Sequence, residues 1–240
     1  MNESKYHFAP YQPLVGCVLL LVAVSILCLM PLFLIEAAQR ALEKLHLSPT
    51  AAMCVLMGIF VGGLVNIPVL RIEKHAEQPL AVHRIHSLMG WVPVQRTRTQ
   101  TILAVNVGGC LIPLGLALFE LTIVLGVQPQ AQFALLIAVV ANVAVCYLVA
   151  RPIQGVGIAM PAFASPAVAV GVVWLLLMPT EYAMVRAPIA FIAGVSGPLI
   201  GADLLHLRDI TRISTGIASI GGAGTFDGIV LSGLLAAFLV

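Results

Sequence analysis

The sequence predicts an all-α integral membrane protein with about seven transmembrane helices, one re-entrant or broken segment and a short cytoplasmic loop that forms an extended hairpin. Composition is the first observation, because 60% of the 240 residues are hydrophobic and only 9% are charged, whereas a soluble domain carries roughly 25% charged residues. The second observation is that apolar runs of about 20 residues, the length that spans a bilayer, recur along the chain. We therefore expect one polytopic membrane domain over residues 1–240.

The first apolar run covers residues 13–35. It is longer than the apolar core of a secretory signal and follows no basic start, so we expect a retained transmembrane helix. Residues 36–47 come next and alternate leucines with charged side chains. That pattern is typical of a short helix lying in the membrane interface. Its apolar positions are Leu42, Leu45 and Leu47, and its charged ones are Arg40, Glu43 and Lys44.

A second helix is expected over residues 50–70, and the only long polar stretch of the chain follows at 71–100. This stretch contains Pro79 and Pro93, and polar and apolar residues alternate over 92–99. Proline and a period of two disfavour a helix and favour strands. The loop is therefore predicted to be a short hairpin or extended segment.

The remaining long apolar runs predict five more helices, over residues 102–125, 132–150, 167–177, 188–205 and 223–240. Residues 151–166 lie between two of them and are apolar, yet rich in proline and glycine. Irregular backbone at membrane depth persists only where protein or a watery cavity satisfies its polar groups. This segment therefore predicts a re-entrant or broken helix, with a surface loop as the alternative.

Basic residues set the expected orientation, because cytoplasmic loops of membrane proteins carry an excess of lysine and arginine. They concentrate in residues 71–100 and after the fourth and sixth helices. We therefore expect a multi-pass protein of the inner (plasma) membrane with a cytoplasmic N-terminus and an external C-terminus. Arg40 and Lys44, which fall on the outer side, depart from the rule.

Composition also limits the classes of ligand and partner. A net charge of +2 gives no reason to expect nucleic acid. The five cysteines lie in apolar runs without metal-ligand spacing, and we find no phosphate loop, nucleophile elbow or haem motif. No cofactor is expected. The expected partners are the lipid bilayer and other membrane proteins, either as substrates or as members of a complex.

Two of the three aspartates, Asp203 and Asp227, lie within apolar stretches near the C-terminus. A carboxylate in hydrocarbon costs at least ~2.5–3.5 kcal/mol, so such a residue is a functional-site hypothesis. The alternative for each is an acid near a helix end that reaches interfacial water. Two carboxylates brought together in a low dielectric would share one proton, the arrangement with which aspartic proteases activate water.

The predicted topology places further polar and small residues at the same depth as the aspartates, in the cytoplasmic third of the membrane. These binding or structural residues are Asn66, Asn106, His206, Gly224 and Thr225. Glycines in these segments would let helices approach closely. The most evident are Gly62, Gly63, Gly108, Gly109, Gly197, Gly201 and Gly222.

Two other ionisable groups have more than one interpretation. His206 follows Asp203 by three residues, so the two share a helical face and could form half of a metal site. A solvated interfacial histidine is the alternative. Glu120 lies toward the outer end of its helix. It is expected to snorkel or to bond a neighbouring helix, and a proton path toward the aspartates is conceivable.

The chain resembles presenilin-like intramembrane aspartyl proteases in having aspartates on adjacent helices, glycines before each of them and the Pro161-Ala162 pair. The chain departs from that pattern in three ways. Alanine, not tyrosine, precedes Asp203, and Asp227 stands three residues after Gly224 instead of directly after a Gly-x-Gly motif. The Pro-Ala pair precedes both acids, whereas in presenilin-like proteins it follows them.

A second resemblance covers nearly the whole chain. The segments NIPV, AVNVGGCLIP, RPIQGVGIAMPAF, GADLLHL and SIGGAGTFDGI resemble those of an uncharacterised prokaryotic family of multi-pass membrane proteins, a domain of unknown function. This resemblance implies a membrane fold with these polar segments near its centre. It implies no particular activity.

Three functions remain open from the sequence. The first is an intramembrane aspartyl hydrolase with Asp203 and Asp227 as catalytic residues. The second is a non-catalytic subunit or assembly factor of a membrane complex, in which the polar cluster holds helices together. The third is a proton-coupled transporter, since broken helices with acids inside the membrane are typical of that class.

The orientation is testable by labelling. A single cysteine introduced at Gln78, in the 71–100 loop, should react with a membrane-impermeant reagent only from the cytoplasmic side, because the basic residues of that loop keep it there. Labelling of intact cells from outside would reverse the topology.

Overall fold

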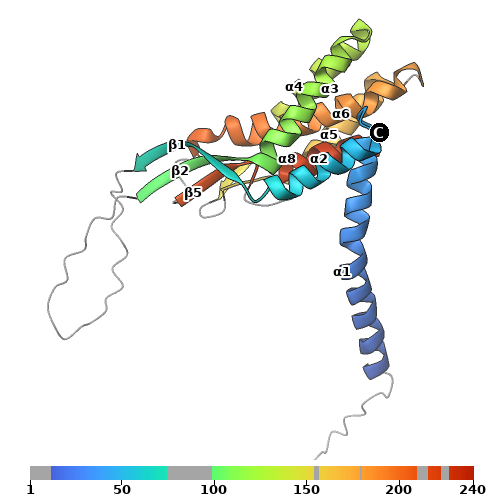
Figure 1. Ribbon diagram of the computed structural model, residues 1–240, viewed down its shortest axis with the longest axis vertical. Coiled ribbons are helices and arrows are strands. Elements are labelled where there is room, and N and C mark those ends of the chain that lie inside the picture. Colours follow the sequence, from blue (N-terminus) through green and yellow to red (C-terminus); the bar gives the residue numbers. More distant parts are fainter. Residues whose placement is uncertain (1–11, 75–98, 154–156, 179, 210–215, 223–226) are drawn as a thin grey trace, which may run out of the picture.

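The computed structural model describes residues 12–74, 99–153, 157–178, 180–209, 216–222 and 227–240 (Figure 1). Most of them are helical. Four helices in this part are long and apolar enough to cross a membrane: Val15–Glu43, Val107–Leu125, Pro129–Val149 and Ala183–Leu204. Three shorter apolar helices are Pro49–Gly62, Ala164–Leu176 and Gly228–Leu239. The prediction of a multi-pass helical protein is confirmed, and the number of spans stays a prediction.

Helix α1 (Gln12–Glu43) joins two elements that the sequence separated into a membrane helix and an interfacial helix. It projects away from the other helices (Figure 1). The apolar side chains of its first half are exposed. Its last turns are docked instead, because Leu42 and Leu45 are fully buried and α1 packs on α2 (Pro49–Gly62) and α8 (Gly228–Leu239). The leucine face of the predicted interfacial helix therefore covers protein, not lipid.

Two paired strands flank the predicted loop, and most of their residues lie outside 71–100. Strand β1 (Asn66–Lys74) pairs antiparallel with β2 (Thr99–Asn106), from Asn66↔Asn106 to Lys74↔Thr99. The sequence had assigned the first residues of β1 and the last residues of β2 to membrane helices, and that assignment is wrong. Both strands are rich in β-branched residues, and α2 ends at a glycine pair, so an apolar run here favours strands. Most of the alternating run at 92–99 lies outside the described residues.

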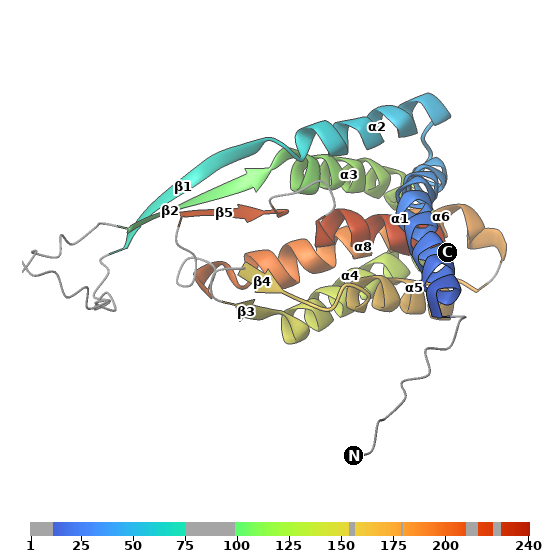
Figure 2. The same ribbon diagram turned by 90° about the horizontal axis from the view of Figure 1, so that it is seen from below.

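A third strand completes this sheet and was not predicted. Strand β5 (Gly216–Ile220) pairs parallel with β2, which gives the order β1-β2-β5 (Figure 2). The all-α assignment is therefore wrong in this part of the chain. A five-residue strand next to glycines has too short a pattern to distinguish from the end of a helix.

The irregular segment after α4 (Pro129–Val149) is not a broken helix. Strands β3 (Arg151–Ile153) and β4 (Gly157–Ala159) form a small antiparallel hairpin, and α5 (Ala164–Leu176) begins five residues later. The residues of β3 are exposed, which is closer to the surface loop that the sequence left as the alternative. An open hollow of about 420 Å³ beside this hairpin is lined by residues of α4, β3 and β4, and neither aspartate lines it.

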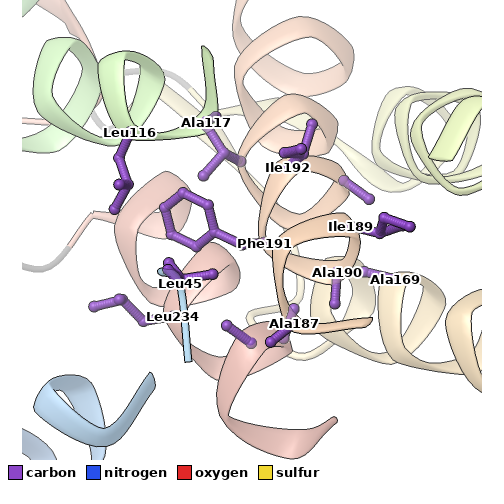
Figure 3. Packing of buried hydrophobic residues seen from close by; sticks show 14 of the residues in the cluster. Leu45, Leu116, Ala117, Ala169, Ala187, Ile189, Ala190, Phe191, Ile192 and Leu234 are labelled. Carbon is purple, nitrogen blue, oxygen red and sulfur yellow. The ribbon is translucent and has the colours of Figure 1, made fainter. Parts of the chain in front are cut away.

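Helix α6 (Ala183–Ser196) forms the centre of the bundle. It follows a short 3-10 turn, Thr180–Tyr182, and continues into the π-helix η3 (Gly197–Leu204). It packs against α3 (Ile112–Leu125), α4, α5 and α8. Phe191 of α6 points toward Leu116, Leu45 and Leu234, which come from three other parts of the chain (Figure 3). All of these side chains are buried, so the apolar core is built around this helix.

A buried polar network ties α6 to its neighbours. The Asn142 side chain of α4 donates to Ser165 Oγ at 2.9 Å and to the Ala193 carbonyl at 2.7 Å. Ser165 Oγ donates to the Gly194 carbonyl at 3.3 Å, and Ser232 Oγ donates to Ser165 Oγ. The three side chains are essentially inaccessible. Hydrogen bonds of this kind hold helices together where the apolar surroundings provide no such bonds.

The bundle has two distinct ends. At one end Tyr182 Oη donates to Gln130 Oε1 at 2.9 Å, and Lys44 Nζ donates to the Phe238 carbonyl at 2.8 Å. These contacts bring together the turns that the sequence predicts to be external, beside the C-terminus. The three-stranded sheet lies at the opposite end (Figure 2). The assignment of the sheet end to the cytoplasm stays a prediction.

Glycines allow close backbone contacts between neighbouring helical segments. A Cβ on Gly108 would lie 2.1 Å from the Ile59 carbonyl oxygen and 2.3 Å from Gly63 N. A Cβ on Gly201 would lie 2.4 Å from the Val143 carbonyl oxygen. The prediction that glycines permit close helix approach is confirmed at these positions.

Gly108→Ala should lower the free energy of unfolding, because the added methyl group overlaps backbone atoms that cannot rotate away; overpacking typically costs about 1–3 kcal/mol. Gly115→Ala is the matched control, since nothing lies within 4 Å of a Cβ at that helical glycine. Thermal denaturation of both purified variants in the same detergent checks this. Equal melting temperatures would show that the contact at Gly108 is not tight.

Candidate functional site

Asp203 and Asp227 come from separate elements and meet at one glycine turn. Asp203 lies in η3, and its Oδ2 accepts a hydrogen bond from Gly221 N at 3.3 Å. Asp227 caps the N-terminal end of α8, and its Oδ1 lies 2.7 Å from the position of a Cβ on Gly222. The two carboxylates are near enough for their charges to interact. Both side chains are half-buried, at the sheet end of the bundle.

The turn between the acids requires glycine at both positions. Gly221 and Gly222 have φ values of 81° and 71°, in the left-handed region that side chains with a Cβ rarely adopt. Gly221 also lies against the start of the helical segment Val107–Leu125, because a Cβ on Gly109 would lie 2.0 Å from the carbonyl oxygen of Gly221. Gly221 is therefore held in a fixed place beside Asp203.

Two π-helices flank this turn. One is η3, which carries Asp203, and the other is η1 (Val107–Leu111), which carries Cys110. Cys110 is buried against Gly221 and lies within electrostatic reach of both aspartates. π-Helical turns are rare in proteins and occur frequently at functional sites. The convergence of two of them with two acids makes this end of the bundle the candidate site.

The predicted asparagines form a support for η1. Asn106 is fully buried, and its side-chain amide donates to the Gly63 carbonyl at 2.8 Å and to Asn66 Oδ1 at 3.2 Å. Its own Oδ1 accepts from Gly109 N at 2.6 Å. Ser219 Oγ of β5 donates to Asn66 Oδ1 at 2.6 Å. This network fixes the end of the sheet against η1 and so places Gly109 under the glycine turn.

His206 does not pair with Asp203. Its Nδ1 donates to the carbonyls of Gly201 and Ala202, both at 3.1 Å, and its ring packs on that of Tyr147 with centroids 4.9 Å apart. These bonds close the last turn of η3. Within the described residues no group of three or more histidine, cysteine, aspartate or glutamate side chains could hold a metal ion.

Gly224 and Thr225 were predicted to join the cluster but lie outside the described residues. Three contributors were not assigned to the site from the sequence, namely Cys110, Ser219 and Gly221. The adjacent glycines at 221 and 222 were the available signal for the turn. Cys110 and Ser219 reach the site only through pairing between distant segments, which a single sequence does not display.

The sequence matches a known protein family. The family described as Protein of unknown function (DUF1614) matches residues 60–239. The chain belongs to this family. The match begins near the end of α2 and extends through α8, so it includes the sheet, both π-helices and both aspartates. No curated protein and no solved structure matches the chain. The DUF1614 family assigns no activity to the site.

Asn106→Leu should destabilise the protein more than Ser219→Ala. The first change leaves buried partners, the Gly63 carbonyl and Gly109 N, without Asn106, at about 1–3 kcal/mol for each unsatisfied group. The second removes one exposed hydrogen bond. Melting temperatures of the two variants check the order. Equal losses would contradict the role of Asn106 as the central support.

Proposed function

We propose that the protein is a membrane-embedded hydrolase in which Asp203 and Asp227 activate water against a peptide bond of another membrane protein. The observation that carries this proposal is the convergence of the two carboxylates on the rigid Gly221-Gly222 turn. Two acids held close in a low-dielectric environment share one proton, so one is a base while the other is an acid.

The shared proton provides the chemistry of amide hydrolysis. The ionised carboxylate removes a proton from water as the water oxygen attacks the substrate carbonyl carbon, and the protonated carboxyl gives its proton to the carbonyl oxygen. The resulting tetrahedral diol collapses when the C–N bond breaks: the carboxyl that took the water proton gives it to the departing nitrogen, and a diol hydroxyl returns a proton to the other carboxylate. Each carboxyl group thus alternates between acid and base, and no cofactor is required.

The sheet supports a peptide substrate. Strand β5 lies at the edge of the order β1-β2-β5 and leads directly into the glycine turn between the acids. An edge strand has free main-chain donors and acceptors that an extended peptide can pair with. A peptide bond in a helix is shielded by its own hydrogen bonds, so an extended segment beside β5 would present a cleavable bond near the acids.

The half-buried position of both acids supports access to water. Hydrolysis inside a membrane requires water at the reacting bond, and a site at an end of the bundle provides it more readily than one at the bilayer centre. In the predicted orientation this end is cytoplasmic. The proposed substrates are therefore membrane segments whose cytoplasmic ends unwind.

Asp203→Asn and Asp227→Asn should each reduce cleavage of a single-span reporter in proteoliposomes by about 10²- to 10⁴-fold, the usual contribution of one acid–base group. Melting temperatures should stay close to that of the unaltered protein, because asparagine keeps the size of the side chain. Asp209→Asn is the matched control, as the third aspartate of the chain, and should retain full cleavage.

Other outcomes separate the competing functions. If no single-span reporter in a panel is cleaved by the unaltered protein, the hydrolase proposal fails. Loss of thermal stability or of a co-purifying subunit in both Asn variants would indicate a non-catalytic subunit. A changed pH dependence of solute uptake, without cleavage, would indicate a proton-coupled transporter.

A further inference from the structure

A second ionisable site lies at the end of the bundle opposite the aspartates. Glu120 of α3 is fully buried, and its Oε2 is 2.9 Å from His46 Nδ1. Its Oε1 is buried and has no hydrogen-bond partner within the described part of the chain. The sequence predicted that Glu120 either snorkels or bonds a neighbouring helix, and the bond to His46 excludes snorkelling. An isolated carboxylate in such surroundings costs several kcal/mol.

His46 is held in an unusual backbone conformation at the point of contact. Its φ is 50°, and it is the only residue other than glycine with a positive φ in the described part of the chain. Such strain costs of order 1–3 kcal/mol and persists only where surrounding contacts enforce it. The adjacent Leu45 is fully buried, so packing on one side and Glu120 on the other hold the imidazole in place.

Among the described residues, His46 is the member of the pair that reaches water. The His46 side chain is 26% exposed, whereas that of Glu120 is 0% exposed. A proton exchanging with the external solution therefore reaches Glu120 through the imidazole. This combination of a sealed carboxylate and an open histidine differs from a surface ion pair, in which both groups exchange protons independently.

The two groups hold one proton between them in their least costly state. A neutral carboxyl with a neutral imidazole, or a carboxylate with an imidazolium, gives a net charge of zero. Loss of that proton leaves a buried negative charge, and a second proton leaves a positive one. Either charge is unfavourable in a low dielectric, so the buried pair favours the state with a net charge of zero.

Other ionisable groups on the surrounding elements have partners of their own. Lys44 donates to the Phe238 carbonyl, and burial lowers the pKa of its amine. Arg186 donates to the carbonyls of Leu177 and Met178. Glu43 accepts from Gln39. The remaining titratable groups on the elements that pack against α3 are Cys54 in α2, Cys110 in η1, and Cys146 and Tyr147 in α4.

We propose that Glu120 and His46 form a proton-binding site that controls the docking of α1 on the bundle. With one proton bound, the His46–Glu120 hydrogen bond holds the turn after α1 against α3. When the proton is released to the external solution, the carboxylate faces a neutral imidazole, and the docked end of α1 separates so that water reaches Glu120. The site is independent of the proposed hydrolytic function.

The experiment measures the distance between α1 and α3 as a function of pH. Spin labels are attached at Arg40→Cys and Leu125→Cys, both exposed positions, in a full-length chain whose other accessible cysteines are serine. We expect a short distance that lengthens at alkaline pH. In Glu120→Gln the change with pH should be lost, because a neutral amide has no proton to release. Glu43→Gln is the matched control and should keep the unaltered profile.

Two results would overturn the proposal. One is a pH profile in Glu120→Gln identical to that of the unaltered chain, and the other is a flat profile in both. If Glu120→Gln does not fold, Glu120→Met provides the same test, since a side chain of similar size without a carboxyl has no proton to release and its pH profile should be flat.

Discussion

The structure depends on the absence of side chains where η1 passes between α2 and the turn after β5. Gly108 lies against the backbone of Ile59 and Gly63, and Gly109 lies against the carbonyl of Gly221. Three backbones meet there without a Cβ between them. Gly221 N donates to Asp203 and Gly222 lies against Asp227, so both carboxylates lie beside the backbone that this contact holds.

The polar groups inside the bundle differ in how many of their hydrogen-bonding atoms have partners. The network of Asn142, Ser165 and Ser232 is closed, because its members bond one another or helix carbonyls. It accounts for helix association and invites no ligand. The aspartates and Glu120 differ, because a carboxylate beside an acid or with an orphan oxygen retains capacity for a proton. In this protein the candidate sites therefore differ from the structural hydrogen bonds in their remaining capacity to bind a proton, not in their polarity.

Much of the architecture was accessible from the sequence. Hydropathy identified the membrane class, and rare acids in apolar runs identified residues that the fold brings together at Gly221 and Gly222. Hydropathy does not distinguish an apolar strand from a helix end, so β1, β2 and β5 were assigned to helices or overlooked. The division of α1 failed because the leucines at 42 and 45 face α2 and α8, and an amphipathic pattern does not reveal whether lipid or protein covers it. The bond between His46 and Glu120 was not predicted, because it joins segments far apart in the sequence and His46 adopts a left-handed backbone conformation.

The parallel pairing of β2 with β5 has a consequence for how the site forms. Thr101 pairs with Gly216, and helices α3, α4, α5 and α6 lie between the two strands in the sequence. Contacts between such distant residues form late in folding, because a large loop must close before they are gained. Asp203 therefore leaves the ribosome without the turn that binds it, and Asp227 follows only with the last helix. A chain interrupted between residues 203 and 227 carries Asp203 without Asp227, so the two carboxylates can meet only after the start of α8 has been synthesised.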